Sequence, residues 1–310
     1  MTRSADVVVV GSVNRDYVCR VDSLPAPGET VLGGEVSVGA GGKGGNQAVA
    51  ASLLGARTAL IARVGRDADG QALVDGLVSA GVDVDDVAAT ETRTGLAFVL
   101  VDARGENSIV VAPGANQRLE PDAVAAAVRR LLTPRSGVLV TQAEIPAETS
   151  AAAIEAAVEA GRRVVVNLAP YRPIDEALLA RSDPLVVNEA EASGLLGREV
   201  RGADQARAAA AELARRAQSA IVTVGPEGAA VARGDWVEQV PVDPVAAVDT
   251  TGAGDAFAGA LAAALSADFD LLDAVRVGVR AGAYAVARAG AQASFPTAAD
   301  LGFRRSSTDR

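Results

Sequence analysis

Residues 249–257, DTTGAGDAF, place one carboxylate, that of Asp255, directly after a run of small residues. The small residues leave backbone N–H groups accessible, and a helix-like run begins at Gly254. Because the first N–H groups of a helix lack partners within it, a helix N-terminus preceded by glycines binds anions. An anion site beside a carboxylate can serve phosphoryl transfer to an alcohol, since the carboxylate orients and deprotonates the hydroxyl. A first-turn Asp that only offsets the helix dipole is the alternative.

A second glycine-rich segment, VGAGGKGGNQAVAAS at 38–52, contains Gly39, Gly41 and Gly44 in G-x-G-x-x-G spacing. A dinucleotide fingerprint directly follows a buried strand, usually the first of the fold, whereas the first apolar run here ends at Gly11. A Walker-type loop also fits poorly, because Lys43 is followed by Gly44 where Ser or Thr would hold magnesium. Neither nucleotide-binding pattern therefore fits in full.

Lys43 and Asn46 nevertheless add a cation and an amide to a loop whose glycines let a ligand approach the backbone. Asn is also among the best N-cap residues, so a purely structural role for Asn46 stays open. The residues alone leave both interpretations of this loop in place.

Composition limits the chemistry. The 310 residues include no histidine and one cysteine, Cys19. Ser-His-Asp and Cys-His catalysis and His-ligated zinc are excluded, so acid–base steps must use Asp, Glu, Lys, Tyr or Cys19. A metal would be bound mainly through oxygen, which favours magnesium.

The net charge of −10 and pI of about 4.7 disfavour nucleic acid and anionic membranes as partners. No apolar run approaches the ~20 residues of a membrane span, and the N-terminal apolar run is too short for a secretory signal. A lone cysteine forms no internal disulfide. We expect a cytoplasmic protein.

Strand-length apolar runs alternate with Ala- and Leu-rich helix-like segments. The predicted strands are 6–13, 58–65, 136–144, 162–170, 184–188 and 219–225, and the predicted helices include 121–133, 147–160 and 204–218. Continuously apolar strands are typical of a parallel sheet covered on both faces, so the pattern predicts an α/β fold. From Thr250 onward the chain is predicted to be mostly helical.

Two segments lack a helix between their strands. Residues 15–38 and 93–112 each read as strand pairs, the second joined by a polar turn at 102–107. We expect antiparallel strands outside the main sheet that form a small lid. An antiparallel edge of the main sheet is the alternative.

Polar residues follow several predicted strands. Glu144, Asn14 and Asn188 stand at such strand ends. Because α/β sheets bind ligands at the carboxyl ends of their strands, these residues are candidate ligand groups. Taken singly, Asn14 and Asn188 are equally typical of turns.

The two glycine-rich segments, GGKGGNQAVAASLLGA and DTTGAGDAFAGAL, resemble the two signature segments of the PfkB (ribokinase-like) carbohydrate kinases. GSVNRD, LPAPGET, VAPGAN, QAEIP, NEAE and GAQASFP follow in the family's order, so the resemblance covers nearly the whole chain. Gly45 and Ala143 depart from residues usual in the family, and neither departure removes a functional group. The resemblance implies a ribokinase-like three-layer α/β/α fold with a mostly parallel sheet and a small β-sheet lid. It further implies a single kinase domain over 1–310, with lid strands inserted at about 15–40 and 93–112.

The resemblance also implies roles for individual residues. Asp255 would be the general base and would also contact the sugar. The anion hole would comprise Gly252, Ala253 and Gly254, and the sugar hydroxyls would bind Asn14, Asp16, Gly42, Lys43, Asn46 and Glu144.

For the nucleotide, the resemblance implies ATP bordered by Thr223, Gly225, Gly228 and Gly254. Asn188 and Glu191 would organise Mg²⁺ and the phosphates through water. A monovalent cation such as K⁺ would be held by Asp249, Thr251, Ala285, Arg288, Gly290 and Ser294. The lid would also form the interface of a homodimer.

PAPGET, VAPGAN and GAQ-S-P are closest to family members that act on ribose. The expected reaction converts D-ribose and ATP to D-ribose 5-phosphate and ADP. Deoxyribose, fructose and a nucleoside remain alternative substrates, although 3% aromatic residues disfavour purine stacking. Two other classes are a nicotinamide-dependent oxidoreductase that uses the glycines at 39–44, and a sugar-binding regulator without activity.

Overall fold

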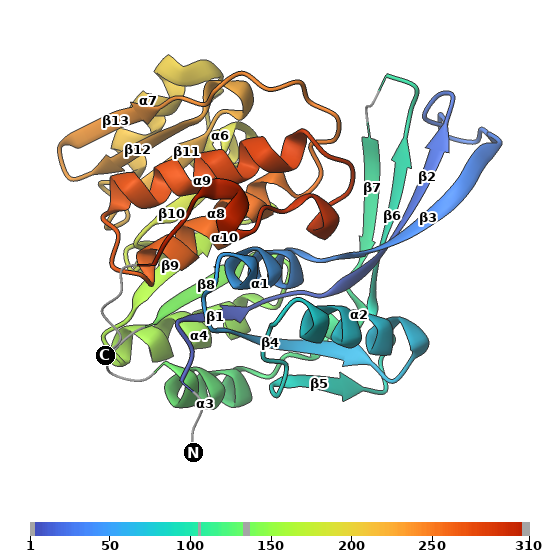
Figure 1. Ribbon diagram of the computed structural model, residues 1–310, viewed down its shortest axis with the longest axis horizontal. Helices are drawn as coiled ribbons and strands as arrows, with labels where there is room; N and C mark the ends of the chain where they lie inside the picture. Colours follow the sequence, from blue (N-terminus) through green and yellow to red (C-terminus); the bar gives the residue numbers. More distant parts are fainter. Residues whose placement is uncertain (1–3, 105–106, 133–136, 306–310) are drawn as a thin grey trace.

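The computed structural model describes residues 4–104, 107–132 and 137–305, and its centre is a nine-stranded sheet (Figure 1). In spatial order the strands are β13 (Trp236–Val240), β12 (Ala229–Arg233), β11 (Ala220–Thr223), β10 (Leu185–Asn188), β9 (Arg163–Asn167), β8 (Val138–Gln142), β1 (Val7–Val10), β4 (Thr58–Gly65) and β5 (Val87–Thr90). From β11 to β5 every neighbouring pair is parallel, whereas β12 and β13 add an antiparallel hairpin at one edge. The predicted α/β class is confirmed.

Helices cover both faces of this sheet, as continuously apolar strands require. One layer comprises α1 (Lys43–Leu53), α2 (Ala68–Ser79), α8 (Ala253–Leu265), α9 (Leu271–Val286) and α10 (Ala298–Leu301). The other comprises α3 (Pro121–Leu131), α4 (Ala147–Glu159), α5 (Glu176–Leu179), α6 (Glu189–Leu196) and α7 (Gly202–Leu213). Strand β1 shows the consequence: all four residues are 0% exposed, with Val7 and Val9 in one core and Val8 and Val10 in the other. The three-layer prediction and the mostly helical last third are confirmed.

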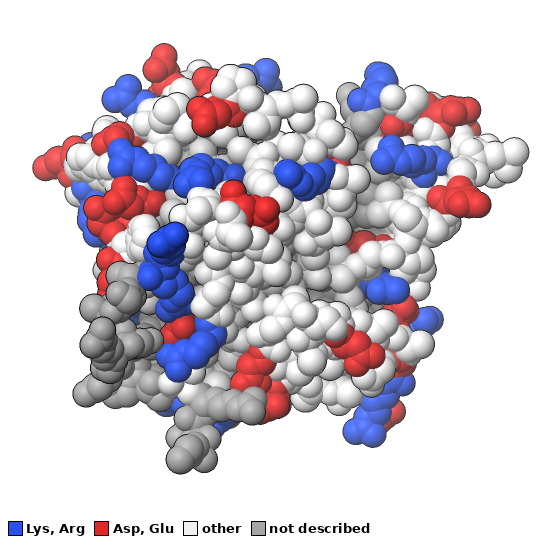
Figure 2. Space-filling view, in the orientation of Figure 1, with Lys and Arg blue, Asp and Glu red and all other residues white. Residues whose placement is uncertain are grey.

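The small sheet is separate from the main one. Its four strands, in spatial order, are β3 (Gly33–Gly41), β2 (Asn14–Val21), β6 (Gly95–Val101) and β7 (Asn107–Ala112). They extend from one side of the main body in Figure 1, and a notch separates their tip from that body in Figure 2. A lid outside the main sheet is therefore confirmed, and the alternative of an edge on the main sheet is wrong. Residues 105–106 of the predicted turn lie outside the described part of the chain.

Pairing within the lid differs partly from the prediction. The pairs β2–β3 and β6–β7 are antiparallel, as expected, but β2 and β6 join them in parallel, with Asn14 opposite Gly95. A parallel pair joins strands that are distant in sequence, so the local pattern carries no sign of it. Three strands of the main sheet were also missed. Strand β5 is short and half exposed. Strands β12 and β13 form a hairpin that follows β11 without an α-helix between, which departs from the alternation of strands and helices.

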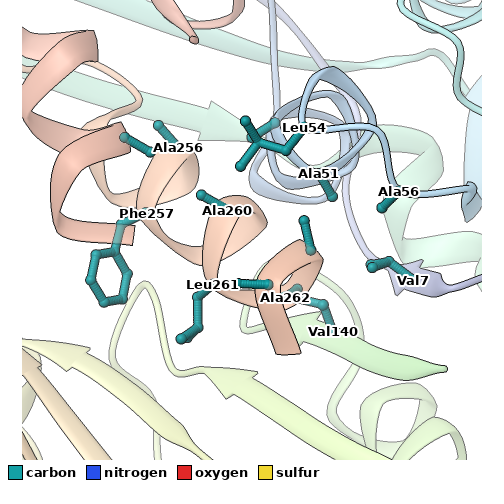
Figure 3. Close-up of a cluster of buried hydrophobic side chains, with 14 of the residues drawn as sticks. Val7, Ala51, Leu54, Ala56, Val140, Ala256, Phe257, Ala260, Leu261 and Ala262 are labelled. Carbon is teal, nitrogen blue, oxygen red and sulfur yellow. The ribbon is translucent and has the colours of Figure 1, made fainter. Parts of the chain in front are cut away.

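The close crossing of α1 and α8 determines where Asp255 lies. A Cβ on Gly259 would lie 2.5 Å from both the Ala50 Cβ and the Gln47 carbonyl oxygen, so only glycine permits this approach. Figure 3 shows Ala256 and Ala260 of α8 beside α1, with Val7 of β1 and Val140 of β8 in the same cluster. Residues four positions earlier lie one turn away on the same helix face. The crossing at Gly259 therefore brings Asp255 of α8 next to the first turns of α1.

No helix in the described part of the chain has the length and apolar character to cross a membrane. On the face shown in Figure 2, basic and acidic residues are interspersed.

Candidate active site

The site lies where the strand order reverses. From β1 the chain adds β4 and β5 on one side, whereas β8 to β13 extend the sheet on the other. Such a switch point leaves a crevice at the carboxyl ends of the two central strands, here β1 and β8. A hydrogen bond crosses it: the Ser12 hydroxyl donates to Glu144 Oε2 at 2.6 Å. The Lys43 backbone N–H donates to the same oxygen at 3.1 Å, which joins the start of α1 to both strands.

The glycines at 41–44 permit close packing of backbone. Gly42 has a φ of 83°, and a Cβ there would lie 2.6 Å from the Asn14 nitrogen. A Cβ on Gly44 would lie 2.6 Å from the Ser12 nitrogen. These glycines therefore press the start of α1 against the connection that follows β1. By contrast, a Cβ on Gly45 would meet nothing closer than 3.8 Å, so its departure from the family pattern is sterically neutral.

Asn46 does not cap α1. The helix begins at Lys43 with Gly42 as its N-cap, which places Asn46 inside the helix. The N-cap interpretation is wrong because the N-cap is Gly42, four residues before Asn46. The Asn46 amide instead donates to Asp255 Oδ2 at 2.9 Å and accepts from Gln292 at 3.0 Å.

Asp255 is a buried, hydrogen-bonded carboxylate. It lies in the first turn of α8, is 6% exposed, and its Oδ1 accepts a second amide N–H from Gln47 at 2.9 Å. Helix α8 begins at Ala253 after Gly252, which has a φ of 77° and serves as N-cap. Gly254 is exposed, so the helix N-terminus is accessible while the carboxylate behind it is shielded. The alternative role, in which Asp255 only offsets the dipole of α8, does not account for the two amide donors that α1 supplies.

Asn14 and Asp16 lie on β2, at the base of the lid. The Asn14 amide oxygen accepts from Asn116 at 2.7 Å, and Asn116 Oδ1 accepts from the Val13 N–H at 2.9 Å. Asp16 Oδ1 is buried without a hydrogen-bond partner. The sequence did not predict site roles for Asn116 and Ser12. Their signal was their place in the VAPGAN and GSVNRD segments, which carry the family resemblance.

The charges of the site are coupled. Burial, reinforced by the charges of Glu144 and Asp255, raises the pKa of Asp16 to about 7 against the opposing effect of Arg15. Burial alone would lower the pKa of Lys43, but Asp255, Glu144 and Glu191 raise it overall. Lys43 is therefore held as a cation among carboxylates.

Asn188 and Glu191 form a capping box at the start of α6. The Asn188 amide oxygen accepts from the Glu191 N–H, and the Glu191 carboxylate accepts from the Asn188 N–H, each at 2.8 Å. Burial raises the pKa of Glu191, although the Asn188 N–H and Lys43 oppose the shift. The N-x-x-E spacing thus has a structural function that the sequence interpretation did not include. The oxygen donors of this pair fit a hard cation such as Mg²⁺.

Three residues expected at the nucleotide lie around the end of β11. Thr223 is its last residue, and Gly225 begins the short 3₁₀ helix Gly225–Glu227. Gly228 has a φ of 86°, and a Cβ there would lie 2.0 Å from the Val240 carbonyl oxygen. The approach of β13 by itself requires glycine at 228.

The expected cation residues are brought together in part. The Asp249 carboxylate accepts from the N–H groups of Thr251 and Gly290, each at 2.9 Å, which joins two distant loops. Burial opposes ionisation, but these hydrogen bonds and Arg20 lower the pKa of Asp249 overall. Ala285 and Arg288 share one helical turn, through the Arg288 N–H and the Ala285 carbonyl at 3.0 Å. Ser294 donates to the Ala291 carbonyl at 2.7 Å. The donor types of these residues, a carboxylate with carbonyl and hydroxyl oxygens, are those that hard cations prefer.

A cavity of about 260 Å³ lies on the other face of β8, beside α4. It is lined by Thr141 and Ala143 but not by Glu144 or Asp255. Gln142 also lines the cavity, so it adjoins β8 itself, but neither carboxylate of the cluster reaches it. The clustered carboxylates, rather than this cavity, make up the candidate active site.

Comparison with known proteins agrees with this geometry. The family described as pfkB family carbohydrate kinase matches residues 4–298. Ribokinase from Haemophilus influenzae is 36% identical over 293 residues, which cover 94% of this chain and 95% of that protein. Deoxyribokinase from Salmonella typhi is 35% identical over 295 residues, covering 94% and 96%. The structure of Arabidopsis thaliana ribokinase complexed with ribose and ATP superposes with a TM-score of 0.86 at 32% identity, covering 96% of this chain and 97% of that one. The chain belongs to the pfkB family of carbohydrate kinases.

Proposed function

We propose that this protein is an ATP-dependent ribokinase, converting D-ribose and ATP to D-ribose 5-phosphate and ADP, with residues 1–310 as one kinase domain. The observation that carries the proposal is Asp255, a buried carboxylate whose two oxygens each accept an amide N–H behind an exposed, glycine-led helix N-terminus. Ribokinase relatives of similar length and a ribokinase structure with ribose and ATP support it.

In the proposed reaction Asp255 accepts the proton of the sugar's primary hydroxyl. The hydroxyl oxygen bonds to the γ-phosphorus as the bond from that phosphorus to the leaving ADP oxygen breaks. The N–H groups of Gly252, Ala253 and Gly254 stabilise the charge on the moving phosphoryl group. The Ala253 N–H donates to the Thr250 carbonyl at 3.3 Å, a long bond that a phosphoryl oxygen can replace.

The sugar lies between α1 and the base of the lid, where it contacts Gly42, Lys43, Asn46 and Glu144. The buried, unpartnered Asp16 Oδ1 supports this position, because such an oxygen needs a donor and a sugar hydroxyl supplies one. Asn14 contributes the remaining polar group. Closure of the lid over the sugar excludes water and limits hydrolysis of ATP.

ATP binds with its phosphates at Gly254, while Thr223, Gly225 and Gly228 border the nucleotide. Asn188 and Glu191 would hold Mg²⁺, which would supply positive charge to neutralise the phosphates. Asp249, Thr251, Ala285, Arg288, Gly290 and Ser294 would hold K⁺, whose charge would act next to the anion hole at 252–254.

The lid also forms a homodimer with a second copy of the chain. It exposes large apolar side chains, namely Leu32 (94% exposed), Val36, Val38, Phe98, Ile109, Val110 and Val111. The strand register places Val36, Val38, Phe98 and Val110 on the same face of the lid sheet, and an exposed apolar face of this kind supports an interaction surface.

A panel of acceptors tests the proposal. ADP formation is measured with ribose, 2-deoxyribose, fructose and adenosine, with magnesium and with or without potassium. We expect ribose to have the highest kcat/KM. Deoxyribose is the second candidate, since the deoxyribokinase relative is as similar as the ribokinases. Lack of turnover on every sugar would refute the kinase proposal, and a higher kcat/KM for any other acceptor would refute ribose as the substrate.

A further inference from the structure

Gln47 links Asp255 to the central sheet. Its side chain is 0% exposed. Its Nε2 donates to Asp255 Oδ1 and to Asn167 Oδ1, each at 2.9 Å, and its Oε1 accepts from Gln142 Nε2 at 2.8 Å. Asn167 in turn donates to the Val186 carbonyl at 3.2 Å. One amide therefore joins α8 to β8 and β9, and through Asn167 to β10.

The orientation of this amide is determined by its partners. An ionised carboxylate only accepts hydrogen bonds, so Gln47 must turn its NH₂ group toward Asp255 and its oxygen toward Gln142. Space for Gln142 comes from Gly11, where a Cβ would lie 2.1 Å from Gln142 Oε1. That Oε1 is buried without a hydrogen-bond partner. A buried acceptor without a donor costs stability, so the arrangement is maintained at a cost.

Asn46 alone cannot fix the carboxylate. A carboxylate held through one oxygen can still rotate about its Cβ–Cγ bond. Asn46 holds Oδ2 from α1, and Gln47 holds Oδ1 while it is itself tied to two strands. With both oxygens restrained, the remaining lone pairs of Asp255 keep a constant direction relative to the N-terminus of α8.

We propose that Gln47 is a positioning residue for phosphoryl transfer, which holds the Asp255 carboxylate in the orientation that accepts the proton of the sugar hydroxyl. The inference rests on the proposed function, in which Asp255 is the general base. It predicts that the loss of the Gln47 amide affects turnover rather than sugar affinity, because Gln47 is buried behind Asp255.

The test compares Gln47→Met with Thr149→Val. Thr149 is also 0% exposed and donates one hydrogen bond, to the Leu119 carbonyl at 2.6 Å, on the other face of the sheet. Gln47→Met loses three buried hydrogen bonds and Thr149→Val loses one, but only Gln47→Met changes the surroundings of Asp255. We expect Gln47→Met to lower kcat about 10- to 100-fold, since a hydrogen bond to a charged group is lost. The KM for ribose should stay within about threefold, and Thr149→Val should keep the wild-type kcat.

The pH dependence of kcat separates positioning from packing. Gln47→Met removes one N–H donor to the carboxylate of Asp255. As the pH is lowered, the variant should therefore lose activity at a higher pH than wild type does, which moves the acid limb of the kcat profile upward. A loss of packing alone would leave the profile unchanged. Gln47→Met with kcat within threefold of wild type, or with a lower kcat and an unshifted profile, would refute the proposal.

A second variant covers the case in which Gln47→Met does not fold. Gln47→Glu keeps the shape but brings a second carboxyl group against Asp255, and two adjacent carboxyl groups resist joint ionisation. Its kcat should fall progressively as the pH rises, and a wild-type profile would overturn the proposal. Wild-type protein inactive on all sugars would refute the proposed function as well. An active wild type with an unaffected Gln47 variant refutes only the role of Gln47.

Discussion

Gly259 should control both the stability of the protein and the position of Asp255, the proposed general base. In a Gly259→Ala variant the new Cβ would lie 2.5 Å from the Ala50 Cβ and the Gln47 carbonyl oxygen, and 3.0 Å from the Ala51 nitrogen. Two of these atoms are backbone and the third is a Cβ, so no side-chain rotation relieves the contact. An ordinary carbon contact of about 3.5 Å requires α1 and α8 to separate by about 1 Å.

The magnitude follows from that separation. Overpacking of this kind costs about 1–3 kcal/mol in the free energy of unfolding. The bonds from Asn46 and Gln47 to Asp255, now 2.9 Å, would lengthen beyond the range of a good hydrogen bond. Misplacement of a catalytic group by about 1 Å costs on the order of 10²-fold in rate, so kcat should fall by about that factor.

Gly76→Ala is the matched control. Gly76 lies in α2, and nothing lies within 4 Å of the position that an alanine Cβ would take there. Alanine at this position should therefore raise the free energy of unfolding by about 0.5–1 kcal/mol and leave kcat unchanged. Urea unfolding and an ADP-release assay on the same preparations measure both quantities. If Gly259→Ala were as stable and as active as wild type, the close α1–α8 crossing would not be what positions Asp255.

Three further predictions concern particular side chains. The pKa of Asp16 is raised from 3.8 to about 7 in the folded state, so between these pH values the native state retains a proton that the unfolded chain releases. The stability that this bound proton contributes is lost as the pH rises toward 7. Asp16→Asn should therefore raise the free energy of unfolding by about 1–4 kcal/mol at pH 8 and by much less at pH 4. The same substitution should increase the KM for ribose. Equal effects on stability at both pH values would contradict the raised pKa of Asp16. Asp255→Asn should lower kcat by about 10²–10⁴-fold without loss of thermal stability, and near-normal turnover would remove Asp255 from its role as base. Val38→Asp together with Val110→Asp, which lie on the same face of the lid sheet, should convert a dimer to a monomer in light scattering, and an unchanged mass would place any dimer interface elsewhere.

Several features of the site could be predicted from the sequence because they depend on neighbours along the chain. The small residues before α8 and the carboxylate in its first turn lie within one helical turn, so their proximity is a property of the local sequence. The continuous apolar runs likewise predicted the parallel strands, since a strand buried on both faces has no polar side. The Asn188–Glu191 capping box was equally local, but its spacing was interpreted for ligand binding alone.

Other features depend on contacts between distant residues. Asn46 and Gln47 meet Asp255 across more than 200 positions, and Ser12 meets Glu144 across 132. The parallel pairing of β2 with β6 is also long-range.

The sequence by itself thus determined the class of fold, the carboxylate and the helix N-terminus beside it. Only the tertiary structure decided which side chains hold that carboxylate, because the crossing of α1 and α8 at Gly259, and not any local pattern, sets which residues meet.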